Sequence, residues 1–233
     1  MIDSLEKIAE DGRTSTFDPG PASEQDRERK TSNTQDWLAS DNPVVHIYGD
    51  TCVEKRYLQA AKEGVEELFR EIGIGASVKI ADQKDYLDKL FAEYRAVDEL
   101  LSARIVVKAI IQDGISHNHL LHADIALTVR GIGGYWGITQ GDDPGKSPRK
   151  ASLVTTSNNT QDTQRVKLVA KHEMTHQIGA EFYSEQNMYN CVKPGCLMTF
   201  KIEGDTLCSK CLKQVIQYIE GQERKYNKKI LIK

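Results

Sequence analysis

The sequence lacks several features that define whole classes of protein. Its 233 residues contain no run of about 18 apolar residues, so no segment is long and apolar enough to span a membrane. Residues 1–13 are polar and charged without an apolar centre, so they do not resemble a secretory signal. The chain also contains no internal repeat. These absences favour a cytoplasmic protein that has no membrane partner.

An excess of basic charge is also missing. The formal net charge is −3, and residues 1–42 carry ten acidic and five basic side chains, so the remainder is nearly neutral. A nearly neutral domain lacks the basic surface typical of nucleic-acid binding. Residues 1–42 have few large apolar side chains, so we expect a disordered polar tail. We expect residues 43–222 to form one domain and residues 223–233 a basic, solvated tail.

From residue 43 onward, segments typical of strands alternate with segments typical of helices. Strands are predicted over residues 44–48, 77–81, 104–111, 123–130 and 152–156, with an edge strand near 135–138. Helices are predicted over residues 53–72, 85–102, 161–171 and 210–220. This alternation predicts an α/β (α+β) fold with a twisted, mixed, largely parallel sheet and flanking helices.

The most informative motif is H-E-x-x-H, which spans His172 to His176. On a helix, residues four apart lie on one face, so both imidazoles can bind the same metal ion. Glu173 between them can reach a metal-bound water, as in zinc hydrolases. Asp162 is a suitable helix cap upstream, and Gly179 a suitable stop. A surface helix that carries two histidines by chance is the alternative.

Four of the five cysteines cluster near the carboxyl end, as Cys191, Cys196, Cys208 and Cys211. Their pattern is C-x4-C, eleven residues and C-x2-C, which is typical of a closed structural zinc site. Two disulfides are the alternative, but cytosolic thiols stay reduced, which favours metal. The fifth, Cys52, we interpret as a small buried apolar residue rather than a nucleophile.

These motifs together resemble one family. Residues 172–182, HEMTHQIGAEF, resemble the metzincin pattern H-E-x-x-H-x-x-G-x-x-H, with Gly179 in place. Residues 191–198, CVKPGCLM, resemble the C-x4-C-x-M segment of the archaemetzincins, and residues 208–211, CSKC, their closing C-x-x-C. The similarity spans roughly residues 104–212.

The resemblance implies a metzincin-like zinc peptidase fold with two zinc ions per chain. It implies a catalytic zinc at His172 and His176, with Glu173 as the catalytic general base, and a structural zinc at the four clustered cysteines, in a zinc loop over residues 191–211. It also implies that Met198 is the methionine of the Met-turn, an apolar floor beneath the catalytic metal. Substrate would be held by an edge strand that contains Tyr135, Trp136, Gly137 and Ile138.

One departure from the family pattern concerns the third zinc ligand. The third histidine of the metzincin pattern falls at position 182, where this chain has Phe182, which cannot bind zinc. The third ligand is therefore displaced, or it is absent and the site is degenerate. The nearby or upstream alternatives are Glu181, Tyr183, Glu185, His117, His119 and His122.

The sequence therefore predicts a zinc metallopeptidase that hydrolyses peptide bonds of a peptide or protein substrate through a zinc-bound water and Glu173. The retained glutamate favours activity, because a carboxylate base has little purpose without a reactive water. The first alternative is a non-catalytic zinc protein of the same fold that binds peptides or partners. The second is a zinc-ribbon module for nucleic acid, which the flat charge balance disfavours.

Overall fold

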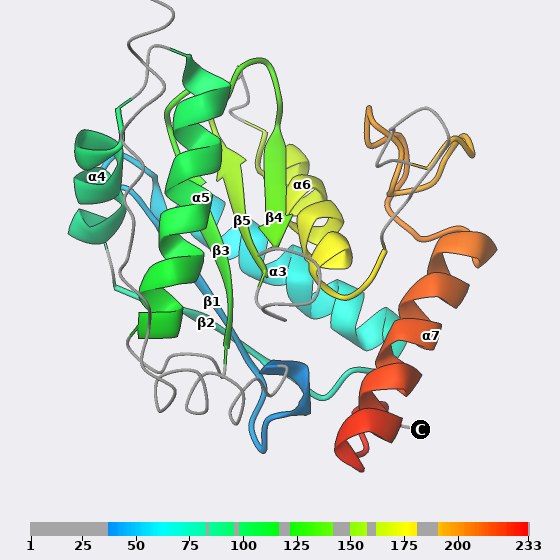
Figure 1. The fold of residues 1–233 in the computed structure, drawn as a ribbon. Helices are drawn as coiled ribbons and strands as arrows, with labels where there is room; N and C mark the ends of the chain where they lie inside the picture. The colour runs from blue at the N-terminus through cyan, green and yellow to red at the C-terminus, as the bar shows by residue number, and fades with distance from the viewer. Residues whose placement is uncertain are drawn as a thin grey trace, which may run out of the picture. The chain divides into compact units, whose positions relative to one another are not determined.

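The computed structural model describes residues 37–82, 84–95, 98–116, 122–141, 150–157, 162–180 and 191–232. Five strands form one sheet in the order β2-β1-β3-β5-β4. The strands are β1 (Val44–Gly49), β2 (Ser77–Ile80), β3 (His122–Thr128), β4 (Gly137–Gly141) and β5 (Lys150–Thr155). Neighbouring strands are parallel except β4, which pairs antiparallel with β5 at the edge. The predicted mixed, largely parallel sheet is confirmed (Figure 1).

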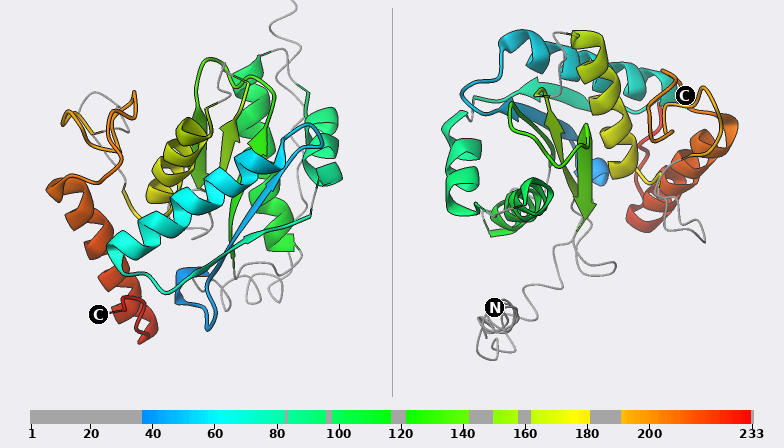
Figure 2. Two further views of the ribbon diagram at one scale, coloured as in Figure 1. Left: turned by 180° about the vertical axis from the view of Figure 1, so that it is seen from behind. Right: turned by 90° about the horizontal axis from the view of Figure 1, so that it is seen from above.

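Helices cover both faces of this sheet (Figure 2). One face carries α3 (Lys55–Ile72) and α6 (Thr163–Gln177), and the other carries α4 (Lys84–Glu93) and α5 (Glu99–Ser116). Helix α7 (Ser209–Tyr226) closes the chain beside the α3–α6 layer, and the short 3-10 helix η2 (Trp37–Ala39) begins the described part. Because strand side chains alternate between faces, the sheet separates two apolar cores.

Helix α3 has a clear amphipathic pattern and packs closely against α6. Helix α3 buries a stripe that includes Leu58, Ala61, Val65 and Leu68. It ends where Gly73 adopts the left-handed conformation, at φ 83°. Gly64 lets α6 approach closely, because a Cβ there would lie 2.3 Å from the carbonyl oxygen of Lys167. The two helices on this face of the sheet are therefore in direct backbone contact.

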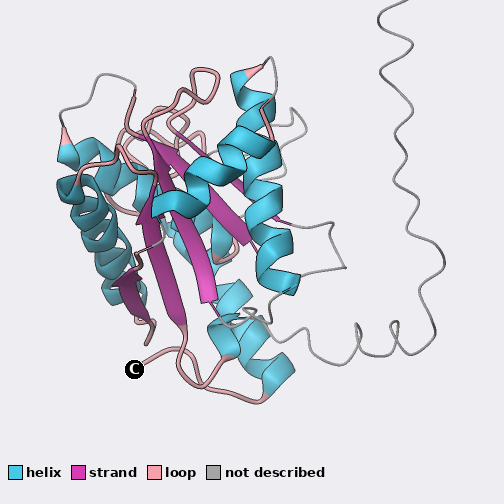
Figure 3. Cartoon of the chain, turned by 90° about the vertical axis from the view of Figure 1, so that its left-hand side faces the viewer, coloured by secondary structure: helices cyan, strands magenta, loops and turns pink. Residues whose placement is uncertain are grey.

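The predicted strand over residues 104–111 is wrong, because these residues belong to α5, which Figure 1 labels. Figure 3, which colours helices cyan and strands magenta, shows the helices packed around the sheet. The segment is rich in β-branched residues, which favour strands locally. Its buried residues are instead spaced three and four apart, at Ala103, Val106, Val107, Ile110 and Ile111. This helical period buries one face of α5 against the sheet, and that packing outweighs local strand propensity. The predicted helix over residues 85–102 is accordingly divided between α4 and the start of α5.

The folded unit extends past both predicted domain limits, residues 43 and 222. Trp37 is buried, and its ring centroid lies 6.4 Å from that of Phe69 on α3. Near the other end, Ile230 is buried, and the backbone N–H of Ile232 donates to the carbonyl of Gly73 at 2.7 Å. The predicted disordered tail lies mostly outside the described residues. Within the described ranges, no helix combines the length and apolar character needed to cross a bilayer.

Candidate metal centres

Helix α6 positions the H-E-x-x-H motif. The side chain of Asp162 accepts a hydrogen bond from the backbone N–H of Gln164 at 2.9 Å, which caps the first turn as predicted. Val166, Ala170 and Met174 are buried against the core and fix the rotation of the helix. With that side of α6 in the core, the two histidines and Glu173 are held by the edge strand and by the loop before α7.

The imidazoles of His172 and His176 are each fixed by one backbone carbonyl. The Nδ1 atom of His172 lies 2.9 Å from the carbonyl oxygen of Leu197, and that of His176 lies 2.9 Å from that of Ala180. A carbonyl only accepts, so each Nδ1 carries the hydrogen, and each neutral ring keeps a lone pair on Nε2. The two Nε2 atoms are 3.1 Å apart.

Two facing lone pairs repel unless a cation lies between them. Two nitrogen ligands of one tetrahedral zinc ion, each about 2.0–2.1 Å from the metal, are roughly 3.3–3.4 Å apart. The observed separation of the His172 and His176 Nε2 atoms is close to that value. The donor pair therefore fits a shared zinc ion.

Burial keeps both histidines neutral. It lowers the pKa of His172 to about 4, and the pKa of His176 to about 3 with a further contribution from neighbouring His172. Neutral imidazole is the form that binds a metal ion. Both rings are thus in the ligating state at neutral pH.

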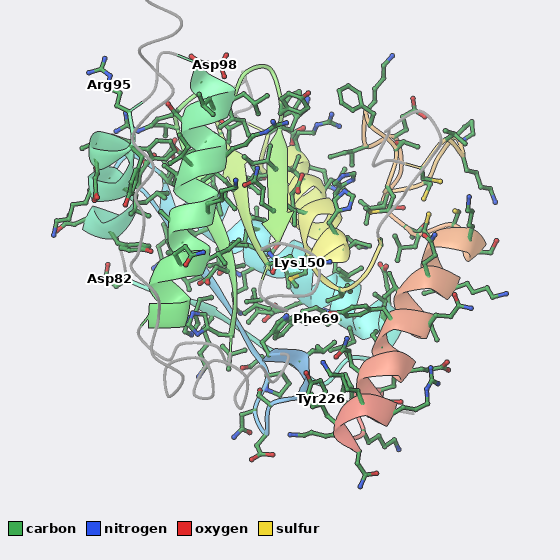
Figure 4. All side chains as sticks on the ribbon, in the orientation of Figure 1. Phe69, Asp82, Arg95, Asp98, Lys150 and Tyr226 are labelled. Atoms are coloured by element: carbon green, nitrogen blue, oxygen red, sulfur yellow. The ribbon has the colours of Figure 1, made fainter. Side chains whose placement is uncertain are left out.

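Gly179 makes the second carbonyl contact possible. It adopts φ 102°, in the left-handed region, directly after α6. A Cβ there would lie 2.3 Å from the ring of Tyr218 on α7. This turn brings the carbonyl of Ala180 back onto His176. In addition, Lys150, labelled in Figure 4, donates its ammonium hydrogen to the carbonyl of His176 at 3.2 Å, at the negative end of the helix dipole.

Glu173 is buried beside the edge strand β4. The hydroxyl of Thr139 donates to its Oε2 at 2.5 Å. Burial raises the pKa of Glu173 to about 7, and the hydrogen bond from Thr139 opposes part of that rise. A carboxylate with a pKa near neutrality is suited to accept and return a proton at physiological pH. Because Gly137 has no side chain, the backbone of β4 can lie close to the Glu173 carboxylate. A Cβ at Gly137 would lie 2.6 Å from the Glu173 Oε1.

A chain of polar groups supports this carboxylate. Gln177 donates its side-chain Nε2–H to the hydroxyl of Ser152 at 2.8 Å, and that hydroxyl lies 2.7 Å from the Thr139 hydroxyl. Sequence reasoning did not single out Thr139, Ser152 or Gln177. The sequence signal that could have identified Thr139 is the alternation of side chains along a strand, which puts Gly137 and Thr139 on the same face of β4.

The four clustered cysteines lie together at the amino end of α7. Their Sγ atoms all lie within 4.8 Å of one another. The separation is 3.8 Å between Cys191 and Cys208, 3.6 Å between Cys196 and Cys211, and 3.2 Å between Cys208 and Cys211. These distances exceed a disulfide bond of about 2.0 Å and approach the roughly 3.8 Å expected for two sulfurs on one tetrahedral zinc ion. Figure 4 shows sulfur atoms gathered where the loop meets the first turn of α7.

Hydrogen bonds and burial determine how readily the thiols of this cluster ionise. Backbone N–H groups of Lys193 and Cys208 donate to the Sγ atoms of Cys191 and Cys196, each at 3.3 Å. Burial raises the pKa values of Cys191 and Cys211. For Cys208, burial also acts upward, but hydrogen bonds from Cys211 and the other thiols lower its pKa to about 6. A set of four thiols, three of them buried and the fourth, Cys208, the acidic one, suits a cation that stabilises the thiolates.

The cysteine loop also touches the histidine pair. Leu197, whose carbonyl holds His172, lies between Cys196 and Met198. Met198 is fully buried, and its carbonyl accepts a hydrogen bond from the backbone N–H of Cys191 at 2.6 Å. The role of Met198 as floor of the metal site stays a prediction. The contact through Leu197 shows that order in the cysteine loop helps orient His172.

The predicted substrate strand begins two residues later than expected. Gly137 and Ile138 belong to β4, whereas Tyr135 and Trp136 precede it. The ring of Tyr135 meets that of Phe200 edge to face, with centroids 6.3 Å apart. The guanidinium of Arg165 on α6 lies 4.5 Å from the centroid of Trp136. These two contacts connect residues 135–136, which lead into β4, with the cysteine loop and with α6.

The third ligand of the histidine pair is not identified. Phe182, Glu181, Tyr183, Glu185, His117 and His119 lie outside the described residues. His122 is described, and it clusters with His46 and Asp124 rather than with α6. Across the described ranges, no third histidine, cysteine or acidic side chain joins His172 and His176 in a metal-binding group. Cys52 is exposed, which corrects its interpretation as a buried residue. It lies beside exposed Thr51 in the turn after β1, and its backbone N–H donates to the carboxylate of buried Asp50.

The largely parallel sheet with helices on both faces and the cysteine cluster near the carboxyl end give a mixed α/β fold that can be compared with solved structures. Comparison with solved structures finds the crystal structure of archaemetzincin from Methanopyrus kandleri, with a TM-score of 0.50 and 14% sequence identity. The match covers 76% of this chain and 95% of that one, and it shows an archaemetzincin-like fold. No family model and no curated protein matches the sequence.

Proposed function

We propose that this protein is a zinc-dependent metallopeptidase. The observation that carries the proposal is the pair of Nε2 atoms of His172 and His176, 3.1 Å apart and both free of hydrogen. Beside them, on the same helix, lies a buried glutamate with a pKa of about 7. A zinc ion held by these imidazoles supplies a Lewis acid that polarises a carbonyl group and acidifies water.

Glu173 is the proposed general base. It takes a proton from the attacking water and later delivers it to the leaving amine. Its pKa of about 7 lies near neutral pH, where a carboxylate can both accept and return a proton. The hydroxyl of Thr139 holds one carboxylate oxygen, and Gly137 leaves space against the other. The residues of β4 thus fix the carboxylate that moves the proton.

The substrate is proposed to be an extended peptide that adds to the edge of the sheet. Among the strands of the described residues, β4 is the last on its side of the sheet. The free edge of such a strand offers backbone donors and acceptors to a peptide, with little dependence on side-chain identity. The Tyr135–Phe200 pair and Trp136 lie at the entrance to this edge and supply apolar surface for side chains.

The four clustered cysteines are proposed to hold a second, structural zinc ion. That ion would fix the loop whose Leu197 carbonyl orients His172. A closed site of four thiolates leaves no position for substrate, so this zinc is not expected to react.

The test is peptide-library cleavage by wild type and Glu173→Gln, with zinc content measured for both. The amide keeps the shape of the side chain and still accepts from Thr139, so folding and zinc content should be retained. Loss of a positioned base typically lowers the rate about 100-fold to 10,000-fold. Glu66→Gln, which removes a partly exposed carboxylate on α3, is the matched control. Equal cleavage by the Glu173 variant, or none by zinc-loaded wild type, would overturn the proposal and favour a binding scaffold.

A further inference from the structure

A second group of ligand-type side chains lies within the sheet itself. His46 is on β1, and His122 and Asp124 are on β3. The parallel register pairs His46 with Asp124 and Val44 with His122. Side chains two residues apart in a strand lie on the same face, as do those of paired residues in neighbouring strands. The three side chains therefore converge at the amino ends of β1 and β3.

This group faces away from α6. Val45, Ile47, Ala123 and Ile125 belong to the core under α3 and α6. The alternating positions Tyr48 and Ala126 belong to the opposite core, which α4 and α5 cover. The same alternating positions as Tyr48 and Ala126 are occupied by His46, His122 and Asp124, so these three side chains lie on the face that α4 and α5 cover. They are thus separated from His172 and His176 by the thickness of the sheet.

The distances within the group are those of a metal site. The Nε2 of His122 lies 3.3 Å from the Oδ1 of Asp124, and the rings of His46 and His122 have centroids 4.3 Å apart. One ligand atom from each residue lies within 4.8 Å of the other two. Two ligands on one tetrahedral first-row ion are roughly 3.3–3.4 Å apart. The Nε2 of His122 and the Oδ1 of Asp124 have this spacing, and a ligand atom of His46 lies within 4.8 Å of both.

The chemistry of the group also fits a cation. The side chain of Asp124 is 4% exposed, so its carboxylate lies inside the protein beside His122. Two imidazoles and one carboxylate form a ligand set that zinc and related divalent ions bind, with remaining positions open.

We propose that His46, His122 and Asp124 form a further metal site, for zinc or another first-row divalent ion that imidazole binds. The ion would join β1 to β3 at their amino ends and stabilise the sheet where its central strands begin. This site is separate from the H-E-x-x-H pair and from the cysteine cluster. It does not depend on peptidase activity.

The test uses the full chain with His172→Ala and His176→Ala, so that the H-E-x-x-H pair cannot bind. Mild chelation removes weakly held metal, whereas a closed four-thiolate site retains its zinc. Zinc alone is then titrated by calorimetry and by the thermal midpoint. One further zinc per chain is expected to bind, with a rise in the midpoint, because an ion that binds only the folded state stabilises it.

The ligand variants are His46→Gln and Asp124→Asn, each made in the same double-alanine background. Each should raise the Kd for this zinc more than about 100-fold, because even loss of a residue that only supports a ligand costs about 10-fold to 100-fold. Asp41→Asn, which removes a fully solvent-facing carboxylate, should leave the Kd unchanged. If Asp124→Asn fails to fold, His46→Gln alone decides. No uptake of zinc in the background chain, or an unchanged Kd in the folded ligand variants, would overturn the site.

Discussion

Replacement of Gly137 by alanine tests how closely the edge strand must approach Glu173. The added Cβ would lie 2.6 Å from Oε1, 2.8 Å from Cγ and 2.9 Å from Cδ of Glu173. Ordinary contact begins near 3.4 Å, so strand or carboxylate must move by about 0.8 Å. Glu173 is buried and bonded to Thr139, so it cannot rotate into solvent without losing that contact.

We expect Gly137→Ala to lower kcat/KM about 100-fold, because a misplacement of about 1 Å has this effect on positioned groups. Overpacking should lower the free energy of unfolding by about 1–3 kcal/mol. Gly221→Ala on α7 is the matched control, since its Cβ would meet nothing within 4 Å and alanine favours helices. The assays are peptide cleavage at measured zinc content and urea unfolding. Wild-type cleavage by Gly137→Ala would refute the proposed contact between β4 and the base.

Three further changes have expected outcomes. In protein whose histidine pair is metal-free, the raised pKa of Glu173 makes folding less favourable as pH rises from about 4.5 through about 7. The free energy of unfolding of Glu173→Gln, measured with urea, should therefore exceed that of wild type by about 3 kcal/mol at pH 8, and the difference should shrink toward pH 5. A difference that stays constant with pH would contradict the raised pKa. Metal analysis of Cys211→Ser should show one zinc fewer per chain. The loss of that zinc also removes a binding free energy on the order of 10 kcal/mol, which stabilises the folded loop. Cys52→Ser, at an exposed cysteine, should change neither zinc content nor stability. Met198→Leu conserves volume and should cost less than about 1.5 kcal/mol in urea unfolding, but Met198→Ala should cost about 2–5 kcal/mol, and equal stabilities would show that the site is loosely packed.

The parts of the fold that sequence predicts best are those where local pattern and tertiary packing agree. The strands near 44–48 and 152–156 are short, mostly buried apolar segments, as inner strands of a sheet covered on both faces are. Helix α6 has a capping aspartate, an apolar stripe and a glycine after its end. The i, i+4 spacing of His172 and His176 follows from helix geometry alone. These features needed no knowledge of distant contacts.

Features that depend on long-range pairing were not predictable in the same way. The β-branched segment in α5 is helical because its face packs on the sheet, which local propensity does not contain. His46 and Asp124 lie far apart in sequence and meet only through the parallel register of β1 and β3. Thr139 reaches Glu173 because β4 pairs with β5 at the edge. In each case the partner was set by the sheet rather than by neighbours in the chain.

The central claim is that His172 and His176 share a metal ion beside Glu173. Anomalous diffraction from crystals of the zinc-loaded full chain, measured at the zinc absorption edge, tests it directly. The account predicts a peak about 2.0–2.1 Å from both Nε2 atoms, with both Nδ1 atoms still on the carbonyls of Leu197 and Ala180. Further peaks are expected among the four clustered cysteines and at the group of His46, His122 and Asp124. Zinc at the cysteines with no peak between the two histidines would contradict the metallopeptidase assignment.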